Sequence, residues 1–244
     1  MWRNKTVSVI FPTYNEKESI KEAIEDFFGS GYVDEIVVVN NNAAAGTDEE
    51  VKKTKARLVY ESRQGYGYSI RKGLEEAKGE LLIISEPDGT FLGRDVIKLL
   101  SYSDDFDYVL GTRTTRELIW ARANMDRFLK WGNWAVAKMM EFLFNCTTLT
   151  DVGCTMRLIK RNAYEMIKNQ FSIGSSHFGP EVTLLAIANN IKFLEIPLNY
   201  KKRVGKSSVT GNKFIAFRLG FIMIHLIITF WLRYIMGKRS LDKR

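Results

Sequence analysis

Glu86-Pro87-Asp88 is the tripeptide whose residue types point most directly to metal chemistry. It follows residues 81–84, a continuous apolar run that predicts a buried strand. Two carboxylates two residues apart at a strand end can hold a divalent metal, and such oxygen ligands suit Mg²⁺ or Mn²⁺. A metal there would neutralise the charge that builds on a diphosphate leaving group. The alternative is a solvated turn over residues 87–89.

Two glycine-containing segments have residue types that could bind phosphate. Gln64-Gly65-Tyr66-Gly67 opens a predicted helix, where backbone amides could approach a phosphate or a base. Gly205-Lys206-Ser207-Ser208 lies between basic residues and suits a mobile phosphate clamp, although a solvated loop explains it equally well. Neither segment has the spacing of a P-loop or of a dinucleotide-binding fingerprint.

Nearly every predicted strand ends in a polar loop. We expect strands at residues 6–11, 36–39, 57–60, 81–84 and 108–110, separated by segments with helical spacing. This alternation predicts an α/β fold with a mostly parallel sheet and helices on both faces. Ligands bind such sheets at the carboxyl ends of the strands. The polar residues that follow the strands should therefore converge on one crevice, and they are residues 13–16, 40–42, 86–88 and Arg113.

Two segments in the second half of the chain could contact a membrane. Residues 118–145 predict an amphipathic helix, which is either a core helix or an interfacial helix with tryptophans at headgroup level. Residues 214–236 are strongly apolar, but the stretch between Arg218 and Arg233 spans roughly 20 Å as a helix, short of the roughly 30 Å hydrocarbon core. We therefore expect this helix to lie in the interface or to pack on the first, with a boundary between residues 1–212 and 213–244.

The composition is globular, with a basic balance. The 244 residues suit one α/β domain with a modest appendage, and they carry a formal net charge of +8. Basic clusters flank the C-terminal apolar segment, which favours a membrane surface over a nucleic acid as the partner. A strand-like segment begins almost at once, so we expect no signal peptide. We expect the protein to lie at the cytoplasmic face of a membrane. Cys146 and Cys154 should therefore be reduced thiols.

An ordered set of motifs resembles glycosyltransferase family 2. Residues 9–16 look like the opening strand and nucleotide-binding loop of that family, and Glu86-Pro87-Asp88 stands where the family has Asp-x-Asp. The other matches follow in the family's order: residues 37–42, residues 63–67, the segment from Asp151 to Arg157, Ile196-Pro197-Leu198-Asn199-Tyr200, and Arg203-Val204-Gly205-Lys206-Ser207. The resemblance covers residues 6 to about 208. It implies a GT-A fold and an inverting, metal-dependent transfer of a sugar from a UDP or GDP sugar.

The resemblance also implies roles for single residues. Asp88 would bind Mg²⁺ or Mn²⁺, with Glu86 and Thr90 as further ligands. The implied nucleotide contacts are Pro12, Thr13, Tyr14, Asn15, Glu16, Asn41, Gln64, Gly65 and Glu86. Two features depart from the family pattern. Asparagines replace the usual aspartates after the second strand, and the metal motif begins with a glutamate.

The closing motifs resemble the branch of polyprenyl-phosphate sugar synthases, which implies a lipid phosphate as the acceptor. The implied phosphate-binding residues are Arg113, Arg127, Arg157, Arg203, Lys206 and Ser207. A phosphate is already ionised at pH 7, whereas a hydroxyl acceptor on a lipid-linked glycan would need a base. Asp151 and Glu181 are the candidates for that base, and they join Asp88 and Arg113 in the predicted catalytic set. A non-catalytic sugar-nucleotide-binding or membrane scaffold protein is the alternative from another class.

Overall fold

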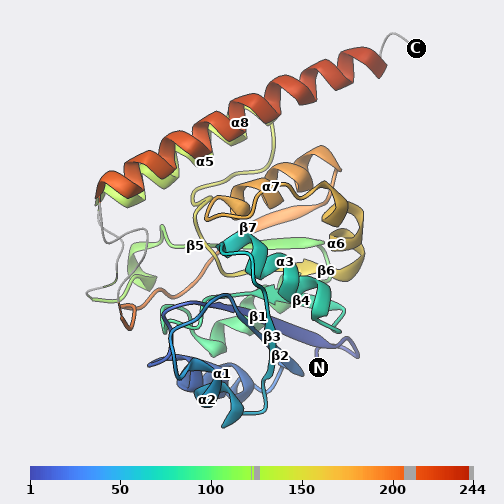
Figure 1. Cartoon of the computed structure of the whole chain (residues 1–244). Coiled ribbons are helices and arrows are strands. Elements are labelled where there is room, and N and C mark those ends of the chain that lie inside the picture. The colour runs from blue at the N-terminus through green and yellow to red at the C-terminus, as the bar shows by residue number, and fades with distance from the viewer. Residues whose placement is uncertain (122, 124–126, 206–212, 242–244) are drawn as a thin grey trace.

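A seven-stranded sheet forms the centre of the computed structural model, which describes residues 1–121, 123, 127–205 and 213–241 (Figure 1). The strand order is β3-β2-β1-β4-β6-β5-β7. Six strands are parallel to one another: β1 (Val7–Thr13), β2 (Glu35–Asn40), β3 (Arg57–Tyr60), β4 (Leu81–Ile84), β5 (Tyr108–Thr112) and β7 (Phe193–Pro197). The seventh, β6 (Arg157–Lys160), is antiparallel to both of its neighbours. The predicted α/β class with a mostly parallel, GT-A-type sheet is confirmed.

Helices cover both faces of this sheet. The first face carries α1 (Ile20–Gly29), α2 (Thr47–Lys52) and α4 (Val96–Tyr102), and the second carries α3 (Tyr66–Glu76), α6 (Arg161–Ile167) and α7 (Phe178–Ala188). Short 3₁₀ turns lie at Gly93–Asp95, Arg116–Leu118 and Lys168–Gln170. Because helices cover both faces, a central strand must be apolar on both sides. All seven residues of β1 are accordingly buried.

Two long helices form an outer layer over α7. They are α5 (Arg127–Phe144) and α8 (Lys213–Leu241), which lie side by side in Figure 1. Met223 and Ile227 of α8 are buried in the core of the second face. The ring of Phe144 on α5 lies 6.1 Å from that of Phe230 and 5.5 Å from that of Tyr234. The C-terminal helix thus packs on the earlier amphipathic helix, which is one of the two arrangements expected.

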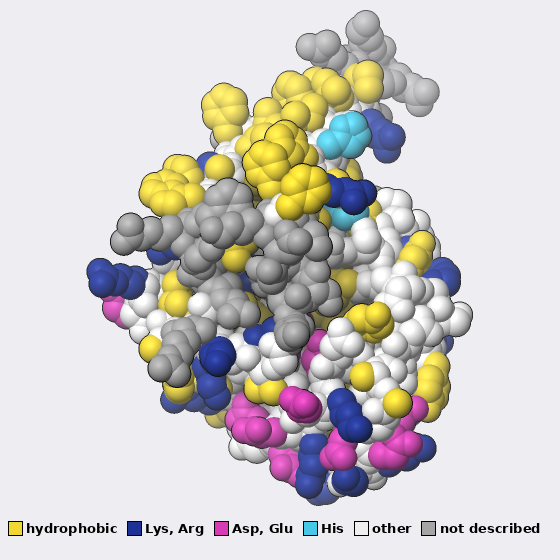
Figure 2. Space-filling model, turned by 60° about the vertical axis from the view of Figure 1, so that its left-hand side comes forward, with side chains coloured by type: hydrophobic (Ala, Val, Ile, Leu, Met, Phe, Trp, Pro, Cys, Tyr) yellow, Lys and Arg dark blue, Asp and Glu magenta, His cyan; other side chains and the backbone are white. Residues whose placement is uncertain are grey.

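The outward side of α8 carries an apolar stripe. Its exposed side chains recur at helical spacing: Phe214, Phe217, Phe221, Ile228, Leu232 and Met236. Trp131, Trp134 and Phe142 of α5 are exposed as well. Figure 2 shows hydrophobic side chains gathered at this end of the molecule, whereas acidic side chains gather at the opposite end.

The first long helix is shorter than the sequence indicates. It was predicted over residues 118–145, and it begins at Arg127. Ile119 instead pairs with Tyr200 of the segment that follows β7: Tyr200 N donates to Leu118 O at 2.9 Å, and Trp120 N donates to Tyr200 O at 2.9 Å. These bonds to a distant segment replace those that a helix would make within itself, so Trp120 lies outside α5.

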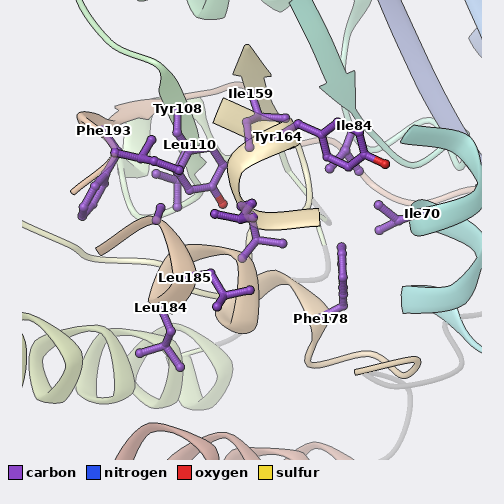
Figure 3. Close-up of a cluster of buried hydrophobic side chains, with 14 of the residues drawn as sticks. Ile70, Ile84, Tyr108, Leu110, Ile159, Tyr164, Phe178, Leu184, Leu185 and Phe193 are labelled. Carbon is purple, nitrogen blue, oxygen red and sulfur yellow. The ribbon is translucent and has the colours of Figure 1, made fainter. Parts of the chain in front are cut away.

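The larger core lies between the second face of the sheet and its helices. Figure 3 shows Tyr108 and Ile159 of the sheet in one cluster with Leu184 and Leu185 of α7. These four side chains are at most 4% exposed. Such close packing gives the strands a rigid base, so the loops at their carboxyl ends have fixed starting points.

Candidate active site

Loops from three neighbouring strands meet at the carboxyl edge of the sheet. Thr13 at the end of β1 is the register partner of Asn40 at the end of β2, and β4 lies on the other side of β1. The Ser19 hydroxyl donates to Pro87 O at 2.7 Å, which ties the loop after β1 to the loop after β4. The residues predicted to converge at 13–16, 40–42 and 86–88 are therefore brought together.

Glu16 organises the loop after β1. Its Oε2 accepts hydrogen bonds from Tyr14 N at 2.7 Å and Asn15 N at 2.8 Å, and a longer one from the Thr13 hydroxyl. Its Oε1 accepts a bond of 2.9 Å from Arg203. Of the predicted nucleotide contacts in this loop, Glu16 is thus the one that shapes the backbone. Tyr14 is exposed at the rim.

Asn41 joins the loop after β2 to the start of α3. Its amide nitrogen donates to Glu61 O and Arg63 O, both at 2.8 Å, and its Oδ1 accepts from Gly65 N at 2.8 Å. The polar atoms of Asn41 and the amide of Gly65 are therefore engaged within the protein. Gln64 is exposed beside them, and its side-chain Oε1 accepts a hydrogen bond of 2.9 Å from the side-chain nitrogen of Asn42.

Asp88 is fully buried at the end of β4. Its Oδ1 accepts bonds from Thr90 N at 2.9 Å and from the Thr90 hydroxyl at 2.6 Å. Its Oδ2 lies 3.2 Å from Arg203 Nε, but the N–H is not directed at it, so this oxygen accepts no hydrogen bond from the described residues. A buried carboxylate oxygen without a donor is costly unless a ligand satisfies it.

Glu86 lies beside this carboxylate and is partly exposed. Burial, followed by repulsion from Asp88, raises the pKa of Glu86 to about 8. Arg203 Nη1 lies 4.0 Å from Glu86 and opposes that shift. A bound cation favours the ionised form of a carboxyl, so a metal at Asp88 would lower this pKa.

The donor set fits a hard divalent cation that is shared with a phosphorylated ligand. Asp88 Oδ2 and Glu86 supply oxygen ligands, and the Thr90 hydroxyl holds the other oxygen of Asp88. Within the part of the chain that the structure describes, no cluster of three or more Asp, Glu, His or Cys side chains could form a closed metal cage. Mg²⁺ commonly binds one or two carboxylates and completes its shell with water and substrate phosphate oxygens.

Arg113 and Asp151 form a buried, two-pronged ion pair. Arg113 Nε donates to Asp151 Oδ2 at 2.8 Å and Nη2 donates to Oδ1 at 2.9 Å, while the backbone N of Arg113 adds a bond of 3.0 Å. Burial lowers the pKa of Arg113, but Asp151 more than offsets this and holds it well above its usual value. Asp151 also accepts a bond from Gly153 N at 3.1 Å. This geometry orients Arg113 and leaves little of Asp151 to act as a base.

Glu181 and Arg157 are both buried and hydrogen-bonded to their own surroundings. Glu181 accepts bonds from the backbone N of Ser172 at 2.8 Å and of Ile173 at 3.1 Å, so it holds the loop before α7. Arg157 donates to the Tyr108 hydroxyl at 2.8 Å, to Gly179 O at 2.9 Å and to the carbonyl of residue 154. The geometry gives both predicted site residues a supporting position behind the crevice.

A small hollow lies in front of Arg157. Tyr66, Gly153, Thr155 and Ser176 contribute to its lining. The Thr155 hydroxyl has no hydrogen-bond partner among the described residues. Burial, followed by the charge of Glu86, raises the pKa of Tyr66 well above its usual value. The cavity volume is about 30 Å³, which is large enough to hold ordered water.

Three predicted phosphate-binding side chains lie outside the described residues. They are those of Arg127, Lys206 and Ser207. Arg203, the remaining member of that set, lies beside Glu16 and Asp88.

Two supporting residues were not singled out from the sequence. Glu195 of β7 accepts bonds from Thr150 N at 2.6 Å and Asp151 N at 2.8 Å, so it positions the segment that holds Arg113. Tyr200 places its ring 5.1 Å from the Arg113 guanidinium. Tyr200 ends one of the quoted motifs, which was a signal for it, whereas nothing in the local pattern marks Glu195.

The family model for glycosyl transferase family 2 matches residues 8–167, which include the loops after β1, β2 and β4, Arg113 and Asp151. The chain belongs to this family. The matched residues include Glu16 and Asp88.

Curated relatives share this similarity over most of the chain. Glycosyltransferase AglJ of Haloferax volcanii is 24% identical over 81% of this chain, and the chain covers 63% of AglJ, less than two thirds of its length. A dolichyl-phosphate hexose transferase of the same organism is 25% identical over 83% of this chain and 86% of that protein.

Solved structures share the fold. Glucosyl-3-phosphoglycerate synthase from Mycobacterium tuberculosis, crystallised with Mn²⁺, UDP and phosphoglyceric acid, is 14% identical. It superimposes with a TM-score of 0.71 over 93% of this chain and 79% of that one. At this identity the likeness concerns the arrangement of strands and helices.

Proposed function

We propose that this family 2 glycosyltransferase moves a sugar from a nucleoside-diphosphate sugar to a polyprenyl phosphate at a membrane surface. The observation that carries the proposal is a pair of features that one segment joins: Tyr200 places its ring 5.1 Å from the Arg113 guanidinium, and the adjacent Lys201 N donates to Thr90 O at 2.8 Å, beside Asp88. Asp88 offers a buried oxygen that accepts no hydrogen bond from the described residues, and Arg113 is a buried cation fixed by Asp151. The first suits a metal-bound diphosphate, and the second suits an anionic acceptor.

The donor half of the site would be built on β1, β2 and β4. Asp88 and Glu86 would hold Mg²⁺ or Mn²⁺, which supplies charge neutralisation to the departing diphosphate. Glu16 holds the loop after β1 in place through its bonds to Tyr14 N and Asn15 N, so the nucleotide would meet a preformed backbone surface. The structural relative crystallised with Mn²⁺ and UDP supports this assignment.

The acceptor half would be built on Arg113. Arg113 keeps its charge at every pH of interest because Asp151 stabilises the guanidinium. Guanidinium groups bind phosphate oxygens with strong, directional hydrogen bonds. The dolichyl-phosphate hexose transferase relative supports a lipid phosphate as the acceptor.

An ionised phosphate needs no base before it attacks the sugar. Asp151 and Glu181, the two candidates for a base, each accept several hydrogen bonds from the protein. We propose that they act as positioning residues, Asp151 for Arg113 and Glu181 for the loop before α7. Because neither carboxylate would then be available as a base, a phosphate acceptor is favoured over a hydroxyl acceptor.

Membrane contact would come through α8 and α5. Ala216–Gly237 is long and apolar enough to cross a bilayer by length and composition, and it is mostly exposed. One side of α8 is nevertheless packed on the protein, because Met223 and Ile227 are buried in the core and the rings of Phe230 and Tyr234 contact Phe144 of α5. We propose that the pair lies in the cytoplasmic interface with the apolar stripe of α8 in the lipid, where a polyprenyl chain would also reside.

Nucleotide release by the full chain in vesicles tests the proposal. The reaction would contain Mn²⁺ or Mg²⁺, a panel of UDP and GDP sugars, and a polyprenyl phosphate. We expect release that requires the metal and one donor of the panel. The matched control is the polyprenol of the same length, which offers a hydroxyl in place of the phosphate. Transfer to the polyprenol and not to the phosphate would establish the hydroxyl-acceptor alternative. Metal-dependent donor binding without transfer to either lipid would overturn the lipid-phosphate acceptor and leave a lipid-linked glycan as acceptor, or a binding or scaffold protein, as the alternatives.

A further inference from the structure

Arg203 lies against three carboxylates at the edge of the crevice. Its Nη2 donates to Glu16 Oε1 at 2.9 Å, its Nε lies 3.2 Å from Asp88 Oδ2, and its Nη1 lies 4.0 Å from Glu86 Oε2. The Arg203 side chain is 17% exposed. The guanidinium is therefore a largely buried cation that offsets the negative charge of the crevice.

The backbone around Arg203 is pinned to the loop that carries Asp88. Lys201 N donates to Thr90 O at 2.8 Å, and Val204 N donates to Asp88 O at 2.9 Å. These bonds flank Arg203, so its guanidinium is delivered to the carboxylates by the fold itself. The guanidinium can leave through rotations of its own side chain, without release of this segment.

A guanidinium at this position and a divalent metal compete for the same oxygen. Mg²⁺ binds oxygen ligands at about 2.0–2.1 Å and surrounds itself with an octahedral shell. Arg203 Nε, at 3.2 Å from Asp88 Oδ2, falls within the space of that shell, and two cations so close repel each other. The N–H of Nε is not directed at Oδ2, and within the part of the chain that the structure describes this oxygen accepts no hydrogen bond.

We propose that Arg203 is the resident counter-cation of the metal site, and that a divalent metal binds Asp88 by displacing the guanidinium. The inference rests on the proposed function, because it takes Asp88 as the metal ligand. A diphosphate bound beside the metal offers the displaced guanidinium a new anionic partner. Metal and nucleoside diphosphate therefore bind cooperatively, each favouring the arrangement that the other requires.

Mn²⁺ binding to the full chain without any nucleotide tests the displacement. The concentration of free Mn²⁺ can be followed by its electron paramagnetic resonance signal. Arg203→Met removes the guanidinium, and Arg203→Gln provides a second, polar replacement. We expect both variants to bind Mn²⁺ on the order of tenfold more tightly than the wild type, within the usual range for coupling between sites. UDP should raise Mn²⁺ affinity more in the wild type than in either variant.

The matched control is Lys202→Met, which removes one positive charge from the adjacent, exposed position. It should stay within about twofold of the wild type, because solvent and salt screen a charge at that position. Equal tightening in the control, or unchanged or weaker binding in both Arg203 variants, would overturn the displacement. Asp88→Asn separates the two claims. If it binds Mn²⁺ as the wild type does, the metal site itself is wrong and the displacement with it. If it abolishes binding while the Arg203 variants show no tightening, the displacement alone is wrong.

Discussion

Asp88 carries the metal proposal through one oxygen atom. The Oδ1 atom is held by Thr90, which fixes the carboxylate and leaves Oδ2 directed into the crevice without a donor among the described residues. The proposed metal contact therefore depends on one oxygen atom, Oδ2 of Asp88. Replacement of Asp88 by asparagine, which has nearly the same shape, removes the charge of that carboxylate.

Asp88→Asn should lower turnover at least about 100-fold, because a lost Lewis-acid contact costs several kcal/mol of transition-state stabilisation. The measurement is initial-rate nucleotide release at saturating Mn²⁺. Asp105→Asn removes the same charge from an exposed position in the loop before β5, at the opposite edge of the sheet, and should leave the rate unchanged. Full activity of Asp88→Asn would contradict the assignment.

Arg113→Lys should weaken binding of the acceptor more than binding of the donor. A lysine cannot reproduce the two-pronged pairing with Asp151 or present the same planar face to a phosphate. We expect the KM for polyprenyl phosphate to rise at least about tenfold while the KM for the donor changes less than about threefold. Arg116→Lys, the same change on an exposed 3₁₀ turn nearby, is the control. An equal rise in both KM values would point to a general loss of structure.

A site residue could be predicted from the sequence where the residues next to it show which element it follows. Asp88 follows an apolar strand, and that placement is visible in the sequence. The pairing of Arg203 with Glu16 and the support of Asp151 by Glu195 depend on contacts between distant segments. One sequence contains no record of such contacts, so these partners could not be named in advance.

Among the helices and strands, α8 has the exposed apolar stripe through which we propose that the protein contacts the membrane. Phe217 and Phe221 lie next to each other on it, with ring centroids 4.8 Å apart. Their exposure places two large apolar side chains on the face directed away from α5.

Replacement of both Phe217 and Phe221 by glutamate should reduce vesicle binding at least about tenfold. Each phenylalanine that enters an apolar phase contributes about 1.5–3 kcal/mol, and the new charges oppose entry further. Co-flotation with vesicles containing anionic lipid measures this. The control replaces two exposed apolar residues of α4, Ile97 and Tyr102, by glutamate on the other face of the sheet. Unaltered flotation of the α8 variant would contradict the proposed membrane contact.

Glu35 joins β2 to its surroundings through four hydrogen bonds. They come from the Ser8 hydroxyl, Lys78 N and two nitrogens of Arg57. Burial raises the pKa of Glu35, but the hydrogen bonds from Lys78 N, Ser8 and Arg57 together outweigh burial and lower it. A carboxyl with a lowered pKa stabilises the fold above its unfolded pKa, near 4.5, and loses that contribution as the pH falls through its folded pKa.

Glu35→Gln should therefore destabilise the protein by about 1–3 kcal/mol at pH 7, the usual range for hydrogen bonds to charged groups. The difference from the wild type should narrow as the pH falls below about 4.5. Denaturant unfolding at several pH values measures it. Glu25→Gln, on an exposed face of α1, should change stability by less than about 0.5 kcal/mol. A pH-independent difference would contradict the electrostatic account.

The elements were predictable where one segment is sufficient to define them. The parallel strands and the amphipathic helices follow from local spacing. Strand β6 enters the sheet between β4 and β5 in the opposite direction, which depends on the path of the whole chain. The start of α5 also differs from the predicted one, because Leu118 and Trp120 bond to Tyr200, far along the chain, instead of continuing a helix.

The whole molecule has a crevice at one edge of the sheet and an apolar layer along one end. The donor loops lie at the ends of β1, β2 and β4, and α5 and α8 lie over α7 (Figure 1). A chain with this arrangement could present a water-soluble donor and a lipid acceptor to the same crevice.

Mn²⁺ and UDP together should raise the thermal unfolding temperature more than either alone. A ligand that binds the folded state stabilises it by mass action, by about 2.7 kcal/mol at 100 times its Kd. Excess chelator should return the unfolding temperature to the value with UDP alone, and Asp88→Asn should show no added effect of Mn²⁺. Equal stabilisation by UDP with and without Mn²⁺ would argue against a shared metal–diphosphate site.

The linkage between the transferred sugar and the lipid tests the central claim most directly. The full chain, given Mn²⁺, a labelled nucleotide sugar and polyprenyl phosphate in vesicles, should form a labelled lipid whose sugar is released by mild acid, because the sugar is linked through a phosphate. A labelled lipid that resists mild acid, or label transferred equally to the polyprenol, would contradict the account.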